Sequence, residues 1–232
     1  MNITVISLLD SAKAKMGGYA ALLNYRYMNL SVKAEAEALL SFTVDVKADE
    51  LPIEKVAQAR IAPDREDQFE IYPIDKDLTI PILKGLFLAH PEYKTELVQM
   101  EGSDDPEDRY ILVTVPEVDK NRHDLLMNAV GVLADTCKGQ MDATLGAVTA
   151  ELALKMANAS PESIKEAKDA IQEVYDQYQD VCKQYRADKE QEIEDAYKQY
   201  QEKQAARQKE EEENAGNMQA GLQMKWNPSE NE

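Results

Sequence analysis

The sequence predicts an α+β protein in which a small mixed domain is inserted between the first and second helices of a three-helix bundle. Near the N-terminus and through the second half of the chain, apolar residues recur every three or four positions, as on one face of a helix. Over residues 42–115 the pattern changes to short, partly alternating, β-branched runs bounded by Pro, Asp and Gly. With 232 residues, 44% of them hydrophobic, the chain is long enough for two small domains.

The first helix is predicted from an apolar stripe near the N-terminus. Its members are Val5, Leu8, Ala12, Met16, Tyr19, Leu23 and Tyr27. Gly17 and Gly18 lie inside this stripe, and they begin no phosphate-binding loop because no Lys followed by Ser or Thr comes after them. We interpret the glycine pair as a place of close helix approach or as a weak point of the helix.

Short strands and one helix are predicted for an inserted domain over residues 34–115. The strands cover residues 42–46, 58–61, 68–72, 96–100 and 110–115, where β-branched and aromatic residues concentrate. The helix covers residues 78–89, with Pro81 in its first turn. The chain enters and leaves this domain at residues 31–38 and at Pro116. We expect both crossings to be flexible linkers that let the angle between the domains vary.

A long antiparallel helical hairpin completes the bundle, which comprises residues 1–33 and 116–200. Asp119 is a suitable N-cap for its first helix, which carries apolar residues at helical spacing as far as Leu152. In the turn at residues 158–162, Ser160 caps the next helix and Pro161 takes its first position. The last helix has a stripe with alternating spacings of three and four: Ile164, Ala167, Ile171, Val174, Tyr178, Val181 and Tyr185.

Residues 201–232 are predicted to form an acidic helix extension followed by a disordered tail. The apolar stripe fades beyond Glu192, and residues 210–213 are consecutive glutamates. From Asn214 onward Gly, Asn, Pro and Ser dominate, which favours disorder. An untethered tail is favoured over a peptide-docking motif, whose anchors would be Met218, Leu222, Met224 and Trp226. The acidic extension is a candidate surface for a protein partner.

The charge and the residue types disfavour several classes of function. With 44 Asp and Glu against 26 Lys and Arg, the net charge of −18 disfavours nucleic-acid binding through bulk charge. No apolar run reaches the roughly 20 residues that cross a bilayer, and the first residues lack the pattern of a signal peptide, so we expect a cytoplasmic protein without a membrane partner.

The sequence offers no arrangement of residues that would carry catalysis. His90 and His123 fall in different predicted domains with no cysteine near either, so we expect no metal, cofactor, small-molecule substrate or enzymatic activity. The acidic run at residues 104–108 lacks the alternation of a calcium loop, and a solvated turn is favoured over a cation site.

The two cysteines are predicted to face each other. Cys137 and Cys182 lie at equal sequence distances from the middle of the predicted turn, so antiparallel helices place them at one level of the hairpin. A pair of reduced core thiols is favoured over a redox switch. A disulfide is not expected, because cytosolic thiols are kept reduced and a helix seam rarely gives the Cα separation that a disulfide prefers.

Four short stretches carry a resemblance to a known family. They are residues 52–57 (Pro-Ile-Glu-Lys-Val-Ala), 71–76 (Ile-Tyr-Pro-Ile-Asp-Lys), 111–126 and 188–193 (Asp-Lys-Glu-Gln-Glu-Ile). In order and spacing they resemble segments of ribosome recycling factors, over about residues 5–195. The resemblance implies an L-shaped, non-enzymatic protein that binds the post-termination ribosome and helps elongation factor G to separate the subunits.

The resemblance also implies RNA-binding arginines in the bundle, and here the sequence departs from the family. The family's arginine clusters fall on residues 31–35 and near residues 142–147 of this chain. The residues that replace the arginines are Ser31, Ala34, Asp142, Leu145 and Gly146. The residual RNA-facing candidates are Lys33, Arg122 and Lys138.

Two functions stay open from the sequence. The chain is a translation-associated factor that still meets the ribosome or a translational GTPase, or it is a diverged paralogue that serves as a protein-interaction scaffold and no longer binds ribosomal RNA.

Overall fold

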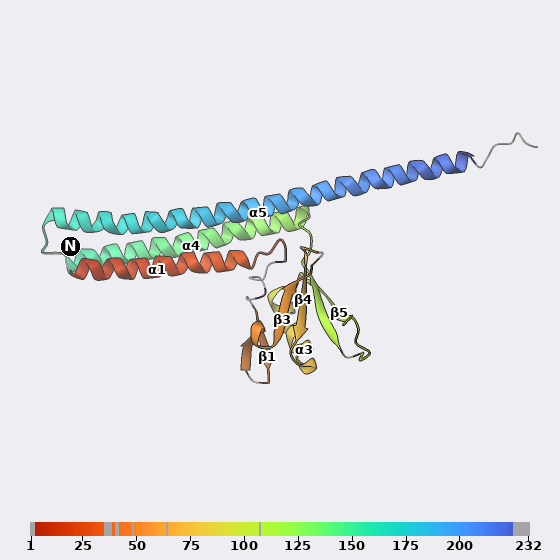
Figure 1. Ribbon diagram of the computed structural model, residues 1–232. Coiled ribbons are helices and arrows are strands. Elements are labelled where there is room, and N and C mark those ends of the chain that lie inside the picture. The colour runs from red at the N-terminus through yellow and green to blue at the C-terminus, as the bar shows by residue number, and fades with distance from the viewer. Residues whose placement is uncertain are drawn as a thin grey trace, which may run out of the picture.

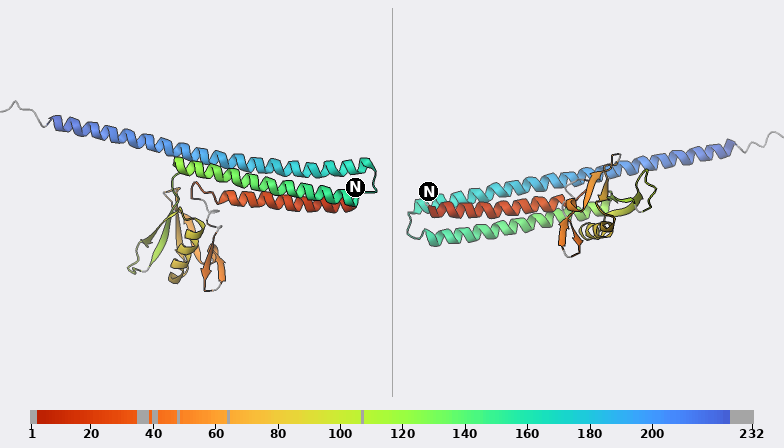
Figure 2. Two further views of the ribbon diagram at one scale, coloured as in Figure 1. Left: turned by 180° about the vertical axis from the view of Figure 1, so that it is seen from behind. Right: turned by 60° about the horizontal axis from the view of Figure 1, so that its bottom comes forward.

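The computed structural model describes residues 3–34, 39, 42–47, 49–63, 65–106 and 108–224. Within these residues, long helices α1 (Ile3–Met28), α4 (Lys120–Lys155) and α5 (Pro161–Met224) lie side by side, and a small sheet domain projects sideways where α1 ends and α4 begins (Figure 1). Figure 2 shows the same arrangement from two further sides. The predicted fold class, α+β with an L-shaped bundle and inserted domain, is confirmed.

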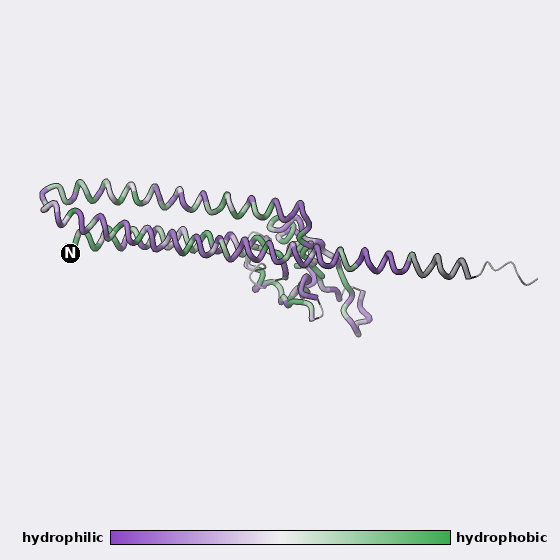
Figure 3. Tube along the Cα trace, turned by 90° about the horizontal axis from the view of Figure 1, so that it is seen from above, coloured by the Kyte–Doolittle hydropathy of each residue, from purple (hydrophilic) through white to green (hydrophobic). Residues whose placement is uncertain are grey.

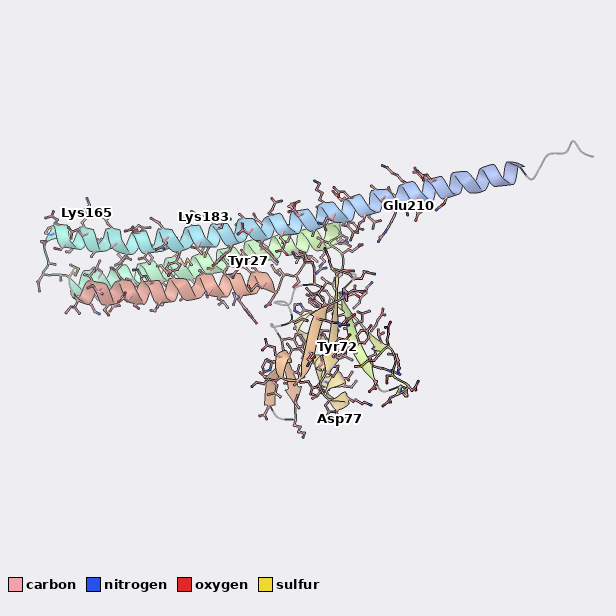
Figure 4. All side chains as sticks on the ribbon, in the orientation of Figure 1. Tyr27, Tyr72, Asp77, Lys165, Lys183 and Glu210 are labelled. Atoms are coloured by element: carbon pink, nitrogen blue, oxygen red, sulfur yellow. The ribbon has the colours of Figure 1, made fainter. Side chains whose placement is uncertain are left out.

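The bundle is held together by the apolar stripes of its three helices. The largest of their fully buried side chains are Met16, Met141, Leu152, Ile171 and Ile193. Near the sheet domain, the Tyr27 hydroxyl donates a hydrogen bond to the carbonyl oxygen of Val130 at 3.0 Å, which joins α1 to α4 (Figure 4). Burial, the largest effect, raises the pKa of Tyr27 to about 12, so the hydroxyl keeps its proton at neutral pH.

The sheet domain is built on an antiparallel sheet with the strand order β3-β4-β6-β5. The strands are β3 (Ala57–Ile61), β4 (Gln68–Pro73), β5 (Lys94–Gln99) and β6 (Arg109–Thr114). Helix α3 (Thr79–Ala89) covers one face, where alternate strand residues bury Phe69, Ile71, Ile111 and Val113. Period-two alternation therefore places the polar strand residues on the opposite face.

A hairpin of β1 (Thr43–Val46) and β2 (Asp49–Pro52) packs beside α3, and short 3-10 turns at Ile53–Lys55 and Lys76–Leu78 complete the domain. Gly85 makes the approach to the hairpin possible, because a Cβ atom there would lie 2.6 Å from the carbonyl oxygen of Thr43. Strand β2 is not predicted from the sequence. Its acidic residues and Pro52 have low strand propensity, so this strand depends on pairing with β1 rather than on its own composition.

The C-terminal helix is longer than the sequence predicts. It continues past Asn214 to Met224, because the Gln, Ala, Met and Leu that surround Gly216 and Gly221 are good helix formers. Figure 3 shows that the extension beyond the bundle is mostly hydrophilic up to the residues drawn in grey. The predicted tail anchor Trp226 lies outside the described residues.

The two glycines of α1 have different surroundings. A Cβ atom at Gly17 would lie 3.1 Å from the Tyr178 hydroxyl oxygen, so Gly17 allows a close approach of α5. A Cβ atom at Gly18 would meet nothing within 4 Å.

Core packing on α4 can be tested with two leucines that lie two positions apart. Leu152 is fully buried, whereas Leu154 is 81% exposed. Leu152→Ala is expected to lower the free energy of unfolding by about 2–5 kcal/mol, because it leaves a cavity at the bundle core. Leu154→Ala, the control, is expected to change it by less than about 0.5 kcal/mol. Urea denaturation measures both, and equal losses would contradict the assigned core.

Candidate functional site

The joint between the two domains is organised by one arginine. Arg122, in the first turn of α4, donates a hydrogen bond from Nη2 to the carbonyl oxygen of Ser31 at 2.7 Å. Its Nη1 donates to the carbonyl oxygen of Pro116. Because Ser31 and Pro116 lie in the two linkers, a single guanidinium ties both chain crossings to the bundle.

The sheet domain holds the same two linkers from its own side. The backbone nitrogen of Ala34 donates to the carbonyl oxygen of Glu66 at 2.9 Å, and that of Val115 donates to the carbonyl oxygen of Asp67 at 2.8 Å. Flexible linkers are expected from the sequence, whereas the structure bonds each linker both to Arg122 and to the turn between β3 and β4.

Arg122 is therefore a structural residue of the joint, where its guanidinium bonds both linkers. The guanidinium is half-buried, and burial lowers the pKa of Arg122, while the charges of Glu92, Tyr93 and Asp119 oppose that shift. The backbone nitrogen of Arg122 also donates a hydrogen bond to Oδ1 of Asp119 at 2.8 Å, and Asp119 is the predicted N-cap of α4.

The other residual candidates do not form one basic surface. Lys33 lines a cavity at the joint, between the linkers and α5. Lys138 lies on the middle of α4 and forms an ion pair with Asp142 at 3.0 Å. Asp142 also accepts a hydrogen bond from the Tyr175 hydroxyl. This hydrogen bond, followed by that from Lys138, lowers the pKa of Asp142, so the carboxylate stays charged and offsets the lysine.

The positions that replace the family's arginines differ in their exposure. Ser31 and Ala34 are buried in the linker that Arg122 holds, and Leu145 packs against the bundle core. Asp142 and Gly146 face solvent, and a Cβ atom at Gly146 would meet nothing within 4 Å. Among the five positions, these two could carry long side chains on the surface of α4 without disturbing the packing.

The histidines and the acidic run are held by neighbouring side chains. The buried His90 ring stacks on Tyr93, and the His123 Nε2 atom lies 3.0 Å from Glu194 Oε1. In the acidic run, Lys76 Nζ lies 2.6 Å from Asp105 Oδ2 and 3.3 Å from Asp108 Oδ1. No group of three residues in the described part of the chain is arranged to hold a metal ion.

The structure brings the two cysteines together. The Sγ atoms of Cys137 and Cys182 lie 3.7 Å apart across the seam between α4 and α5, and both thiols are free. Burial, with a further effect of Cys137, raises the pKa of Cys182 to about 12. Burial also raises the pKa of Cys137. Both groups are therefore thiols, not thiolates, at neutral pH.

Two surfaces of the sheet domain were not identified from the sequence. On the outer sheet face, Arg60 Nε lies 2.5 Å from Glu70 Oε2, and the hydroxyl of Tyr72 donates to the same carboxylate at 2.7 Å (Figure 4). Arg60 and Glu70 lie opposite each other because of the register between β3 and β4. That register depends on the geometry of the turn between the two strands, which the sequence pattern does not give. On α3, the side chains of Ile80, Phe87 and Leu88 are exposed.

No helix in the described residues combines the length and the apolar composition needed to cross a membrane.

Comparisons with known proteins agree on one family. The sequence model described as ribosome recycling factor matches residues 25–193. The solution structure of a ribosome recycling factor superposes with a TM-score of 0.67 at 16% identity, covering 84% of this chain and 100% of that chain. The T. thermophilus ribosome recycling factor, in an assembly with E. coli elongation factor G on the E. coli post-termination complex, superposes with a TM-score of 0.53 at 18% identity. This match covers 82% of this chain and 98% of that chain. No curated protein matches the chain.

The role of Arg122 is tested by removing its side chain. Arg122→Ala is expected to lower the free energy of unfolding by about 1.5–3 kcal/mol, because it leaves half-buried linker carbonyls without their charged donor. Lys120→Ala, in the same helical turn, removes an exposed ion pair with Asp124 and a contact 6.0 Å above the centre of the Tyr197 ring, and should cost less than about 1 kcal/mol because the side chain is exposed. Urea denaturation measures the free energy of unfolding of both variants. Equal losses would show that the hydrogen bonds of Arg122 to the two linkers do not stabilise the joint.

The state of the thiols is tested by alkylation. At pH 8 a rise in pKa from 9.0 to about 12 lowers the thiolate fraction of Cys182 about a thousandfold, so iodoacetamide should leave the native protein unmodified over hours. In urea both cysteines should react, which serves as the control. Intact-mass measurement counts the adducts. Native alkylation at the rate of a free thiol would contradict the raised pKa of Cys182.

Proposed function

Because the chain belongs to the ribosome recycling factor family, we propose that it acts as a ribosome-recycling-like translation factor. The observation that carries the proposal is the family match over residues 25–193, which includes the end of α1, the whole sheet domain and the bundle part of α4 and α5. Its partners are the post-termination ribosome and a translational GTPase of the elongation factor G type. It acts by binding, in the cytoplasm, without catalysing a reaction of its own.

We further propose that the bundle of this chain binds ribosomal RNA only weakly. A charge-assisted contact contributes about 1.5–3 kcal/mol, and each phosphate contact adds to the salt dependence of binding. Arg122 is engaged with the linkers, and Lys138 is paired with Asp142. The surface of α4 around Asp142 and Gly146 therefore supplies little net positive charge.

Affinity for the ribosome would then come from contacts other than phosphate pairing. The sheet domain supports this part of the proposal, because Ile80, Phe87 and Leu88 are exposed on α3. Spacings of seven and eight residues put these three on one side of α3, and exposed apolar side chains gathered on one side of a helix are typical of a surface that contacts protein.

The second candidate function is a protein-interaction scaffold that has left the ribosome. The observation in its favour is the same pairing of Lys138 with Asp142, which neutralises the one lysine of the middle of α4 that would face RNA. The two functions differ in a single property, since only the first requires ribosome binding.

Co-sedimentation with purified ribosomes over about 50–200 mM salt separates the two functions. The wild type is expected to pellet at low salt with a shallow slope of log affinity against log salt. Asp142→Arg combined with Gly146→Arg should pellet more strongly, with the slope steeper by roughly 0.7–0.9 for each phosphate that the new arginines neutralise. Leu145 is left unchanged because it packs against the core.

The matched control is Glu173→Arg with Gln177→Arg, which changes the charge by the same amount on exposed positions of α5. These positions lie about 200° around the helix from Tyr175, which contacts Asp142, so they face away from the site. The control should behave as the wild type. Tight wild-type binding with a steep slope would contradict the loss of RNA contacts, and no pelleting at any salt would favour the scaffold.

A further inference from the structure

Helix α5 extends past the bundle and lies against the joint between the domains. The bundle helices α1 and α4 meet the sheet domain at their ends, whereas α5 continues beyond it, and Glu210 lies on this projecting part (Figures 1 and 4). The family model ends at residue 193, so the extension is an addition to the matched region. Its position raises the question of what it does at the joint.

Two cations of the extension face one carboxylate of the exit linker. Lys203 Nζ lies 3.6 Å and Arg207 Nη2 lies 3.8 Å from Glu117 Oε1. Glu117 follows Pro116, the residue whose carbonyl oxygen is bonded to Arg122. The extension therefore contacts the linker next to the point where the bundle holds it.

The extension also borders the sheet domain across a cavity of about 290 Å³. Tyr200 and Lys203 line one side of this cavity, and Arg65 and Asp67 of the turn between β3 and β4 line the other. The pKa of Asp67 is lowered chiefly by its hydrogen bonds with Arg65, and Lys203 lowers it further. Lys203 thus interacts with charges on both the linker and the sheet domain.

The part of α5 just before the extension is fixed to α4. The ring of Tyr197 lies against His123 with 4.7 Å between ring centroids, and His123 Nε2 lies 3.0 Å from Glu194 Oε1. These contacts set the rotation of α5 where it leaves the bundle, and a continuous helix carries that rotation to Lys203 and Arg207.

We propose that the extension is an electrostatic strut that holds the angle between the bundle and the sheet domain, with Glu117, Lys203 and Arg207 as its positioning residues. The side chains are 36%, 60% and 58% exposed. Each ion pair therefore changes the ratio of molecules with the held angle to molecules with other angles by at most about fivefold. Salt weakens this effect because it screens the charges. The relevance of this angle to ribosome binding rests on the proposed function, but the strut itself does not.

Small-angle scattering at about 50 and about 500 mM salt tests the strut in the full chain. At low salt the wild type should fit a narrow range of interdomain angles, which broadens at high salt. The double variant Lys203→Glu with Arg207→Glu should show a broad range of interdomain angles at both salt concentrations. Adding Glu117→Lys to this double variant restores opposite charges in both ion pairs and should narrow the range of angles again at low salt.

The matched control is Lys198→Glu with Lys209→Glu, which changes the net charge equally at exposed positions of the same helix outside these contacts. It should scatter as the wild type, and all four proteins should share one unfolding midpoint, because the contacts are exposed. Identical scattering from the wild type and the Lys203/Arg207 variant at low salt would overturn the proposal. That result would leave ribosome co-sedimentation unaffected, so it is distinguishable from a failure of the proposed function.

Discussion

The architecture of this protein depends on the hydrogen bonds that Arg122 donates to both linkers. An inserted domain is joined to its host by two chain crossings, and each crossing is a place where the domains could separate. One guanidinium holds the carbonyl oxygens of Ser31 and Pro116, and the turn between β3 and β4 receives the backbone nitrogens of Ala34 and Val115. These few bonds hold the sheet domain at the end of the bundle, because the two hydrophobic cores are separate.

The use of Arg122 as a clamp also bears on function. A side chain that holds two linkers has few donors left for phosphate, and the α4 position that still carries a lysine is paired with Asp142. The chain thus keeps the two-domain scaffold of the ribosome recycling factor family, while the lysine in the middle of α4 is paired with a carboxylate. Scaffold and surface can diverge separately, since the core residues that define the fold do not contact the partner.

Much of the fold was predictable, because helical stripes and alternating strands are local patterns. The stripe of α5, its cap at Ser160 and the equal spacing of the two cysteines from the turn need no knowledge of distant contacts. Strand β2 was missed because its stability comes from pairing with β1, and α5 was underestimated because helix propensity outlasts the apolar stripe. The role of Arg122 could not be predicted, since its partner Ser31 lies 91 residues away and is brought near only by the fold.

We propose that this chain helps to separate ribosomal subunits although its bundle pairs with few phosphates of ribosomal RNA. The most direct measurement is light scattering of post-termination ribosomes mixed with the protein, elongation factor G and GTP. The account predicts that the protein accelerates the fall in scattering caused by subunit separation, and that this acceleration persists with only a shallow loss as salt rises. As a positive control, a bacterial ribosome recycling factor should accelerate the fall in scattering with the same elongation factor G and GTP. If that control works and this protein gives no acceleration at any concentration, the proposal is contradicted.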